Sequence, residues 1–141
     1  MASILIVDDD QDGSEAVARV LRKSGHRAVC VPNGREALAM LTGALPDLVL
    51  LDVRMPEMDG ITFLQVLRSY LRWQNLPVIL LTAFAQGPHI TQAMKLHVTD
   101  VFCKGQYEFS DLLAAVERNL KGNPKPPHAG WGPGTSAPPP A

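Results

Sequence analysis

Short apolar runs of strand length recur along the chain and alternate with segments of helical spacing. The runs cover residues 4–7, 28–31, 47–51, 77–81 and 101–103. Apolar residues recur every three or four positions over residues 17–21, 37–41, 63–71, 90–94 and 112–120, which predicts helices. The central runs lack polar alternation, so both faces of their strands are expected to be buried, as in a parallel sheet between helices. The pattern predicts an open, doubly wound α/β sheet of five parallel strands with five helices.

Residues that begin and end helices stand at the boundaries of these segments. Gly25 follows the first helical segment, Asn33 can cap the second, and Gly43 can end it. Ser110 and Asp111 lie near the expected start of the last helix. These signals support the individual helices and leave the strand order open.

The composition changes abruptly after Lys121. Residues 122–141 hold seven of the 12 prolines and four of the 11 glycines. Because such a composition disfavours a packed core, we expect a folded domain over residues 1–121 and a Pro/Gly-rich, disordered or extended tail over residues 122–141. With 46% hydrophobic and 19% charged residues, the 141-residue chain is expected to contain no second folded domain.

Charge and cysteine content narrow the classes of function. The formal net charge is −1 and no stretch concentrates Lys or Arg, so direct nucleic-acid binding is not expected. No apolar run approaches the roughly 18 residues of a membrane span, so no membrane segment is expected. Cys30 and Cys103 stand in apolar runs without metal-ligand spacing, which predicts buried thiols and a cytoplasmic location. The four scattered histidines are assigned surface roles.

Polar residues follow the apolar runs, at the edge where the strands of a parallel sheet end. They are Asp8, Asp9, Asp10, Asp52, Thr82 and Lys104. In open α/β sheets the functional crevice lies beyond this edge. Carboxylates crowded there repel one another and need protonation or a bound cation, and Mg²⁺ prefers such hard oxygen ligands. Asp9 and Asp52 are therefore candidate Mg²⁺ ligands, with Asp8 acting directly or through water.

The same residues suit phosphoryl transfer. An aspartate carboxylate is a known nucleophile toward phosphoryl groups, so Asp52 is a candidate acceptor as well as a metal ligand. The Lys104 ammonium and the Thr82 hydroxyl can stabilise the charge on the transferring phosphoryl oxygens.

Helix capping is the alternative interpretation for residues 8–10, because acidic residues are favourable at a helix N-terminus. Asp10 and Asp12 are assigned to this role. The pair Asp59 and Gly60 is assigned to turn chemistry, since Asp supplies local hydrogen bonds and Gly a permissive backbone.

Four motifs together resemble the receiver domain of two-component response regulators. They are Ile-Leu-Ile-Val-Asp-Asp-Asp at residues 4–10, Leu-Leu-Asp-Val-Arg-Met-Pro-Glu-Met-Asp-Gly at residues 50–60, Leu-Leu-Thr-Ala at residues 80–83 and Asp-Val-Phe-Cys-Lys at residues 100–104. Each motif is weak alone, and the four in this order are specific. The resemblance covers about residues 3–121 and implies a stand-alone, flavodoxin-like domain with strand order 2-1-3-4-5.

The resemblance also implies the roles of six residues. These are the phosphoacceptor Asp52, the acidic pair Asp8 and Asp9, the backbone carbonyl of Arg54 as a further Mg²⁺ ligand, and the phosphoryl-contacting Thr82 and Lys104. By resemblance, the phosphoryl group comes from a sensor histidine kinase or a histidine phosphotransfer protein by self-catalysed transfer and is later lost by hydrolysis. Phosphorylation then shifts the domain toward an active population and alters the face of the fourth helix, fifth strand and fifth helix.

Two positions depart from the receiver pattern. Gly105 replaces the proline that usually follows the lysine, and a non-proline residue does not favour the cis peptide bond often found there. The loop that carries Lys104 is therefore expected to be freer. Val101 stands where the family commonly has a switching aromatic residue, and Phe102 is expected on the opposite face of the sheet.

Arg54 and Phe84 occupy the two positions that, in the family, tune the loss of the phosphoryl group. A guanidinium and a bulky ring at the mouth of the site hinder the attacking water. We therefore expect a fairly long-lived phosphorylated form.

The sequence leaves three functions open. The leading hypothesis is a single-domain response regulator, a monomer or weak homodimer, that signals by phosphorylation-dependent binding of a downstream target protein or by phosphorelay. The second is a receiver-like protein-interaction module that works without phosphorylation. The third, a phosphatase of the haloacid dehalogenase kind, is disfavoured because Arg54 stands where such enzymes have a second aspartate.

Overall fold

The computed structural model describes residues 2–55 and 58–121. Its five strands are β1 (Ser3–Val7), β2 (Arg27–Val31), β3 (Leu48–Leu51), β4 (Val78–Thr82) and β5 (Asp100–Cys103). The helices are α1 (Gln11–Lys23), α2 (Gly34–Gly43), α3 (Gly60–Ser69), α4 (Pro88–Lys95) and α5 (Phe109–Lys121). The strands form one parallel sheet in the order β2-β1-β3-β4-β5, which confirms the predicted fold. The prediction of a disordered tail falls on residues 122–141, outside the described residues.

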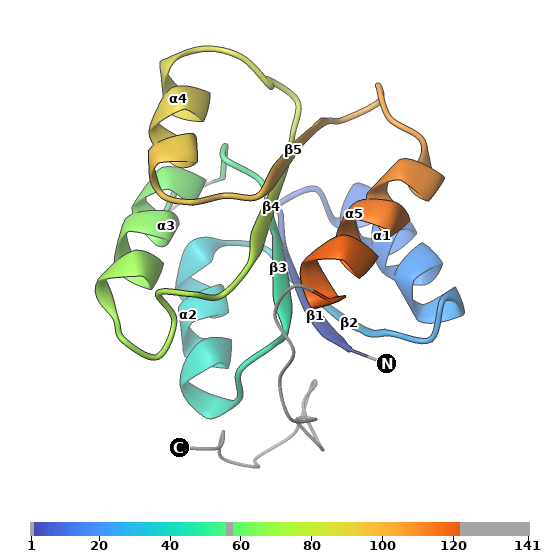
Figure 1. Cartoon of the computed structure of the whole chain (residues 1–141), viewed down its shortest axis with the longest axis horizontal. Coiled ribbons are helices and arrows are strands. Elements are labelled where there is room, and N and C mark those ends of the chain that lie inside the picture. Colours follow the sequence, from blue (N-terminus) through green and yellow to red (C-terminus); the bar gives the residue numbers. More distant parts are fainter. Residues whose placement is uncertain (1, 56–57, 122–141) are drawn as a thin grey trace.

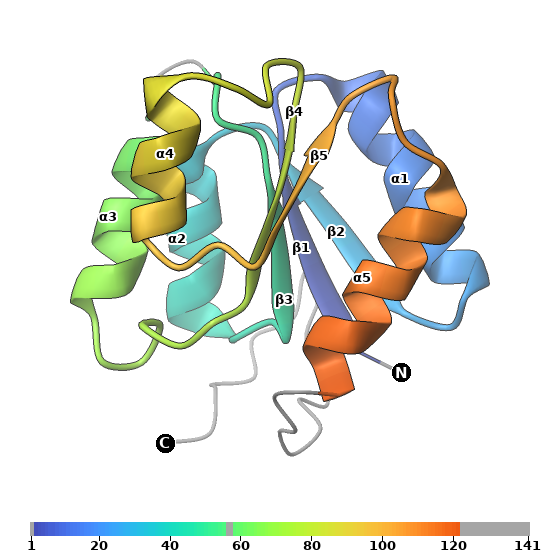
Figure 2. The ribbon, with the colours of Figure 1, turned by 45° about the horizontal axis from the view of Figure 1, so that its top comes forward.

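Helices cover both faces of the sheet. Figures 1 and 2 show α1 and α5 on one face and α2, α3 and α4 on the other. Successive residues of β1 enter different cores: Leu5 and Val7 pack in the cluster under α2, α3 and α4, whereas Ile4 and Ile6 pack under α1 and α5. Because side chains alternate across a strand, a strand buried on both faces needs apolar residues at every position. This is why the apolar runs are continuous.

The strand register brings the carboxyl ends of the strands to one edge. Val7 at the end of β1 pairs with Val31 of β2 and with Leu51 of β3. Thr82 ends β4 opposite Cys103 of β5. The residues that follow these strands therefore begin at a common rim, as the sequence predicted.

The predicted N-caps Asp10 and Asn33 are confirmed. The Asp10 side chain accepts a hydrogen bond from Gly13 N, and Asn33 accepts one from Glu36 N, at the starts of α1 and α2. Gly43 is the last residue of α2. Asp59, assigned from the sequence to turn chemistry, caps α3 by accepting a hydrogen bond from Thr62 N at 2.8 Å.

Three sequence expectations need correction. The runs at 47–51 and 77–81 begin one residue too early, and Thr82 belongs to β4. The thiols of Cys30 and Cys103 are half-buried, because β2 and β5 are the edge strands of the sheet. His26 is buried, with Nε2 2.8 Å from Glu117 Oε1, because the α1–β2 connection packs against α5. Within the described residues, none of the helices has the length and apolar character needed to cross a membrane.

Candidate functional site

Three aspartates converge at the rim, beyond the ends of β1 and β3. One carboxylate oxygen from each of Asp8, Asp9 and Asp52 lies within 4.8 Å of the others. Asp8 and Asp52 are buried, at 5% and 6% exposure, while Asp9 is exposed. Backbone hydrogen bonds from Asp8 N to Val31 O and from Asp52 N to Val7 O hold both residues as continuations of the sheet.

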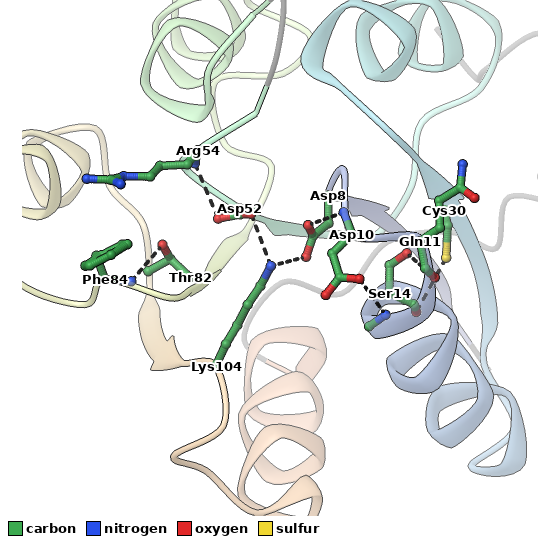
Figure 3. A network of polar contacts seen from close by, with 11 residues as sticks. Asp8, Asp10, Gln11, Ser14, Cys30, Asp52, Arg54, Thr82, Phe84 and Lys104 are labelled. Atoms are coloured by element: carbon green, nitrogen blue, oxygen red, sulfur yellow. Dashed lines mark hydrogen bonds and ion pairs between the residues drawn. The ribbon is translucent and has the colours of Figure 1, made fainter.

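Lys104 reaches the aspartates from the end of β5 (Figure 3). Its Nζ lies 2.7 Å from Asp8 Oδ2 and 3.1 Å from Asp52 Oδ2. The backbone N–H of Lys104 donates to Thr82 O at 2.8 Å, so the β4–β5 pairing continues to this residue. Residues from three strands that are far apart in the sequence thus meet in one site, as predicted.

The charges of this site are only partly balanced. Burial raises the pKa of Asp8, and the Asp52 charge adds to this, while hydrogen bonds from Lys104 and from Asp10 N–H oppose it. Burial lowers the pKa of Lys104, but the hydrogen bond to Asp8 and the charge of Asp52 outweigh it, so the net direction is upward. Three carboxylates face one ammonium, which leaves an excess of negative charge.

The donor atoms at this site fit a hard divalent cation. Carboxylate oxygens from three residues lie close together, and the exposed Asp9 connects the cluster to solvent. Mg²⁺ is bound in proteins by one or two carboxylates and otherwise keeps water, and its charge offsets the excess left by Lys104. The main chain of Arg54 adjoins the cluster, since Arg54 N donates to Asp52 Oδ1 at 3.3 Å.

Thr82 lies at the same rim but makes no direct hydrogen bond with Asp52 among the described contacts. Its side chain is 1% exposed, and Oγ1 accepts a weak hydrogen bond from Phe84 N at 3.4 Å. Figure 3 shows it between Asp52 and the ring of Phe84. The hydroxyl therefore lies at the rim without a direct bond to the aspartates among the described contacts.

The side chains of Arg54 and Phe84 lie next to each other (Figure 3), each two residues after a rim residue, Asp52 and Thr82. The guanidinium carbon of Arg54 is 4.2 Å from the centroid of the Phe84 ring, within the range of a cation–π interaction. Phe84 is half exposed, and its carbonyl oxygen is 2.9 Å from Nε2 of His89 on α4. Nothing in the sequence indicated the stacking or the contact with His89.

Gly60 is required by the packing near Asp52, and nothing in the sequence indicated this requirement. A Cβ at this residue would lie 2.5 Å from Asp52 O and 2.7 Å from Val53 Cα, which are backbone atoms of the acceptor segment. The first turn of α3 therefore packs directly on the strand end that carries Asp52, and only glycine permits this approach. An Asp-Gly pair carries no sign of such a distant contact.

The backbone conformation at residue 105 explains why a glycine stands there. Its φ angle is +78°, in the left-handed region that glycine adopts without strain. Proline is fixed near −65°, so the usual family residue does not fit this backbone conformation. Val101 and Phe102 pack in different cores on opposite faces of the sheet, as predicted.

Comparison with known proteins agrees with this arrangement. The sequence profile of the response regulator receiver domain matches residues 4–117. The chain is 36% identical to the regulatory protein AtoC of Escherichia coli over 118 residues, which cover 84% of this chain and 25% of AtoC. It is 39% identical to the response regulator Rre1 of Synechocystis over 119 residues, 84% of this chain and 51% of Rre1. It thus spans about a quarter to a half of these two relatives.

A solved structure shows the same fold. The receiver domain of a signal transduction histidine kinase from Syntrophus aciditrophicus superposes with a TM-score of 0.81 at 32% identity, covering 89% of this chain and 95% of that domain. With the sheet order, the rim aspartates and the matched profile in agreement, the chain belongs to the response regulator receiver domain family. Members of this family are phosphoacceptor signalling domains rather than conventional enzymes, and they bind Mg²⁺ at an acidic pocket.

Proposed function

We propose that this chain is a response regulator receiver domain that accepts a phosphoryl group on Asp52 from a sensor histidine kinase or a histidine phosphotransfer protein. The observation that carries the proposal is the position of the Asp52 carboxylate, buried at the rim with Lys104 Nζ 3.1 Å away and two further aspartates beside it. A downstream partner, or the next carrier of a phosphorelay, then reads the phosphorylated form.

The metal ligands in this proposal are the carboxylates of Asp8, Asp9 and Asp52 and the backbone carbonyl of Arg54. When bound, Mg²⁺ supplies positive charge between these carboxylates and the oxygens of the incoming phosphoryl group. The raised pKa of Asp8 supports this, because burial disfavours its carboxylate form and a nearby cation would stabilise that form.

In the transfer step, an Asp52 carboxylate oxygen attacks phosphorus and forms a P–O bond. The P–N bond to the donor histidine breaks, its electron pair stays on the imidazole nitrogen, and that nitrogen takes up a proton. Lys104 and Thr82 serve the catalytic role of stabilising charge on the phosphoryl oxygens. Lys104 already lies between Asp8 and Asp52, and Thr82 needs only a local movement of the β4–α4 loop.

Hydrolysis of the phosphorylated form is slow in this proposal: the stacked Arg54 and Phe84 are proposed to hinder the approach of the attacking water to Asp52. The receiver unit comprises residues 1–121, and residues 122–141 form a Pro/Gly-rich extension of it. The domain acts in the cytoplasm as a monomer or weak homodimer.

Labelling with acetyl phosphate in the presence of Mg²⁺ tests the proposal. The wild type is expected to take up one phosphoryl group, and Asp52→Asn is expected to take up none. Asp12→Asn is the matched control, because Asp12 carries the same charge on the exposed first turn of α1 and should leave labelling unchanged.

The same experiment distinguishes this proposal from a receiver-like interaction module that works without phosphorylation. Mg²⁺ binding without any labelling, from acetyl phosphate or from a panel of histidine kinases, would indicate an interaction module that works without phosphorylation. Equal labelling of the wild type and Asp52→Asn would refute the assignment of the acceptor.

A further inference from the structure

A second polar cavity lies at the opposite end of the sheet from the rim. It has a volume of about 530 Å³ and is lined by Arg68, Gln74, His97, Thr99, Arg118 and Asn119, among others. Its walls come from the end of α3, the α3–β4 connection, the α4–β5 turn and α5, the segments that hold the amino ends of β4 and β5. Small-molecule sites are typically clefts of about 300–1,000 Å³.

The charge of Arg68 is not neutralised by a carboxylate. Its side chain donates to five backbone carbonyls, of Trp73, Gln74, Leu76, Leu96 and His97, at 2.7–3.3 Å. Burial lowers the pKa of Arg68, and no carboxylate of the described residues opposes this effect through an ion pair. Carbonyl dipoles solvate the guanidinium but leave its net charge, and half-buried charges are normally paired with an opposite charge.

The other groups that line the cavity add donors and no negative charge. Arg118 is 63% exposed, and Asn119 faces the same space from the next position on α5. The nearby carboxylate, Asp100, does not line the cavity and is already engaged by Arg118 Nη2 at 2.7 Å and by Asn119 Nδ2 at 3.1 Å. Because Asn119 Nδ2 also donates to Ala115 O at 2.7 Å, the donors that the lining adds come mainly from Arg118 and Gln74, beside the positive charge of Arg68.

The wall that carries His97 is fixed in an unusual conformation. His97 has a φ angle of +63°, in the left-handed region that residues other than glycine seldom adopt. The hydrogen bond from Arg68 Nη2 to His97 O, at 3.3 Å, ties this turn to the end of α3. Arg68 therefore joins the α3–β4 connection and the α4–β5 turn into one preformed wall.

We propose that this cavity binds a small organic anion through its phosphate or carboxylate oxygens, at a site separate from the acceptor rim. Guanidinium groups bind planar or tetrahedral oxyanions through paired hydrogen bonds, and Arg118, which lines the cavity with Arg68, has Nε and Nη1 donors besides the Nη2 that donates to Asp100. The volume exceeds what inorganic phosphate alone needs, so the ligand carries its charged group on a larger body.

Nuclear magnetic resonance titration of the ¹⁵N-labelled full chain tests the site. Inorganic phosphate and citrate are added in separate experiments, without Mg²⁺ and at constant ionic strength. We expect saturable shifts of the Leu76, Thr99 and Asn119 amides with at least one of the two probes. A response to phosphate alone assigns a phosphate-bearing ligand, and a response to citrate alone assigns a carboxylate.

Two variants of equal net charge separate a specific site from general attraction. Arg118→Gln should weaken binding about tenfold, with Arg118→Lys intermediate, because each loses paired donors to a different extent. Arg72→Gln, on the exposed α3–β4 connection but outside the cavity lining, should change the affinity less than about twofold. Equal weakening by Arg118→Gln and Arg72→Gln, shifts confined to Asp8 and Asp52, or no saturable shift would overturn the proposal.

Discussion

The ammonium of Lys104 lies 2.7 Å from the carboxylate of Asp8, closer than to the proposed acceptor. Asp8 is nearly inaccessible to solvent, so this ion pair is formed under conditions in which charge is poorly screened. Lys104 therefore compensates one of the carboxylates that are proposed to bind Mg²⁺. The lysine and the metal compete for the same negative charge.

Replacing Lys104 is expected to separate metal binding from phosphoryl transfer. In Lys104→Met, loss of the competing cation should raise the Mg²⁺ affinity about tenfold, or ~1.4 kcal/mol, in calorimetric titration. The rate of labelling by acetyl phosphate should fall about 100-fold, because charge on the phosphoryl oxygens loses a stabilising partner. Lys23→Met, an exposed lysine at the end of α1, is the control for both measurements. An unchanged Mg²⁺ affinity would contradict the competition.

The close approach at Gly60 predicts a large cost for a small substitution. In Gly60→Ala the added methyl group would meet Asp52 O and Val53 Cα, both of which are backbone atoms. The free energy of unfolding should fall by about 1–3 kcal/mol, and labelling should fall with it as the acceptor segment shifts. Urea denaturation measures the first quantity.

Gly43→Ala is the matched control, since a Cβ there meets nothing within 4 Å. The control should be neutral or stabilising by about 0.4–1 kcal/mol, because alanine restricts the unfolded chain. Equal stability of the two variants would show that the α3 packing has more tolerance than the structure indicates.

Arg68 is expected to stabilise the fold through its carbonyl contacts. Arg68→Met retains much of the aliphatic volume but removes donors to five backbone carbonyls of two connections. We expect the free energy of unfolding to decrease by about 2–3 kcal/mol. Arg72→Met changes an exposed arginine on the same connection and should cost less than about 0.5 kcal/mol. Comparable denaturation midpoints for the two variants would argue against this role.

The stack at the mouth of the site predicts how fast the phosphorylated form decays. Phe84→Ala opens the approach to Asp52 and should shorten the half-life of the phosphoryl group several-fold. Tyr70→Ala, another exposed aromatic residue, should leave it unchanged. Because Arg54 acts through the same contact, adding Arg54→Ala to Phe84→Ala should have little further effect. Identical half-lives for wild type and Phe84→Ala would exclude the shielding role.

The alkylation of Cys30 should require a higher pH than that of an exposed thiol. Burial raises the pKa of this thiol from the usual value of 9.0, with the charge of Glu15 adding to it and the Ser14 contact and Arg22 opposing it. Only the thiolate is alkylated, so a raised pKa means slower reaction at pH 8 and an upward-shifted pH profile. Iodoacetamide modification of Cys103→Ser, compared with a model peptide, measures this. A profile that matches the peptide would contradict the effect of burial.

Much of the site could be predicted from the sequence because its residues are tied to strand ends. Asp8, Asp52 and Lys104 directly follow β1, β3 and β5, and parallel strands necessarily end at one edge. Once the apolar runs were recognised as strands, the convergence of these side chains followed. The resemblance to receiver domains supplied the strand order, which local patterns left open.

Other features depend on contacts between segments that no local pattern encodes. The burial of His26 against Glu117, the stack of Arg54 on Phe84 and the five carbonyls around Arg68 each join residues from different connections. Their geometry is set by how helices pack on the sheet and by where the connections then run. A window of sequence carries no information on either.

The sequence by itself determined the parallel sheet between helices, the helix caps and the ring of acidic and basic residues at one rim, because periodicity and strand-end position are local properties. Only the tertiary structure decided that Lys104 lies nearer to Asp8, that Gly60 must lack a side chain, and that a cationic cavity exists at the far edge. These depend on distances of a few ångströms between segments far apart in the chain, and such distances are fixed only when the whole core packs.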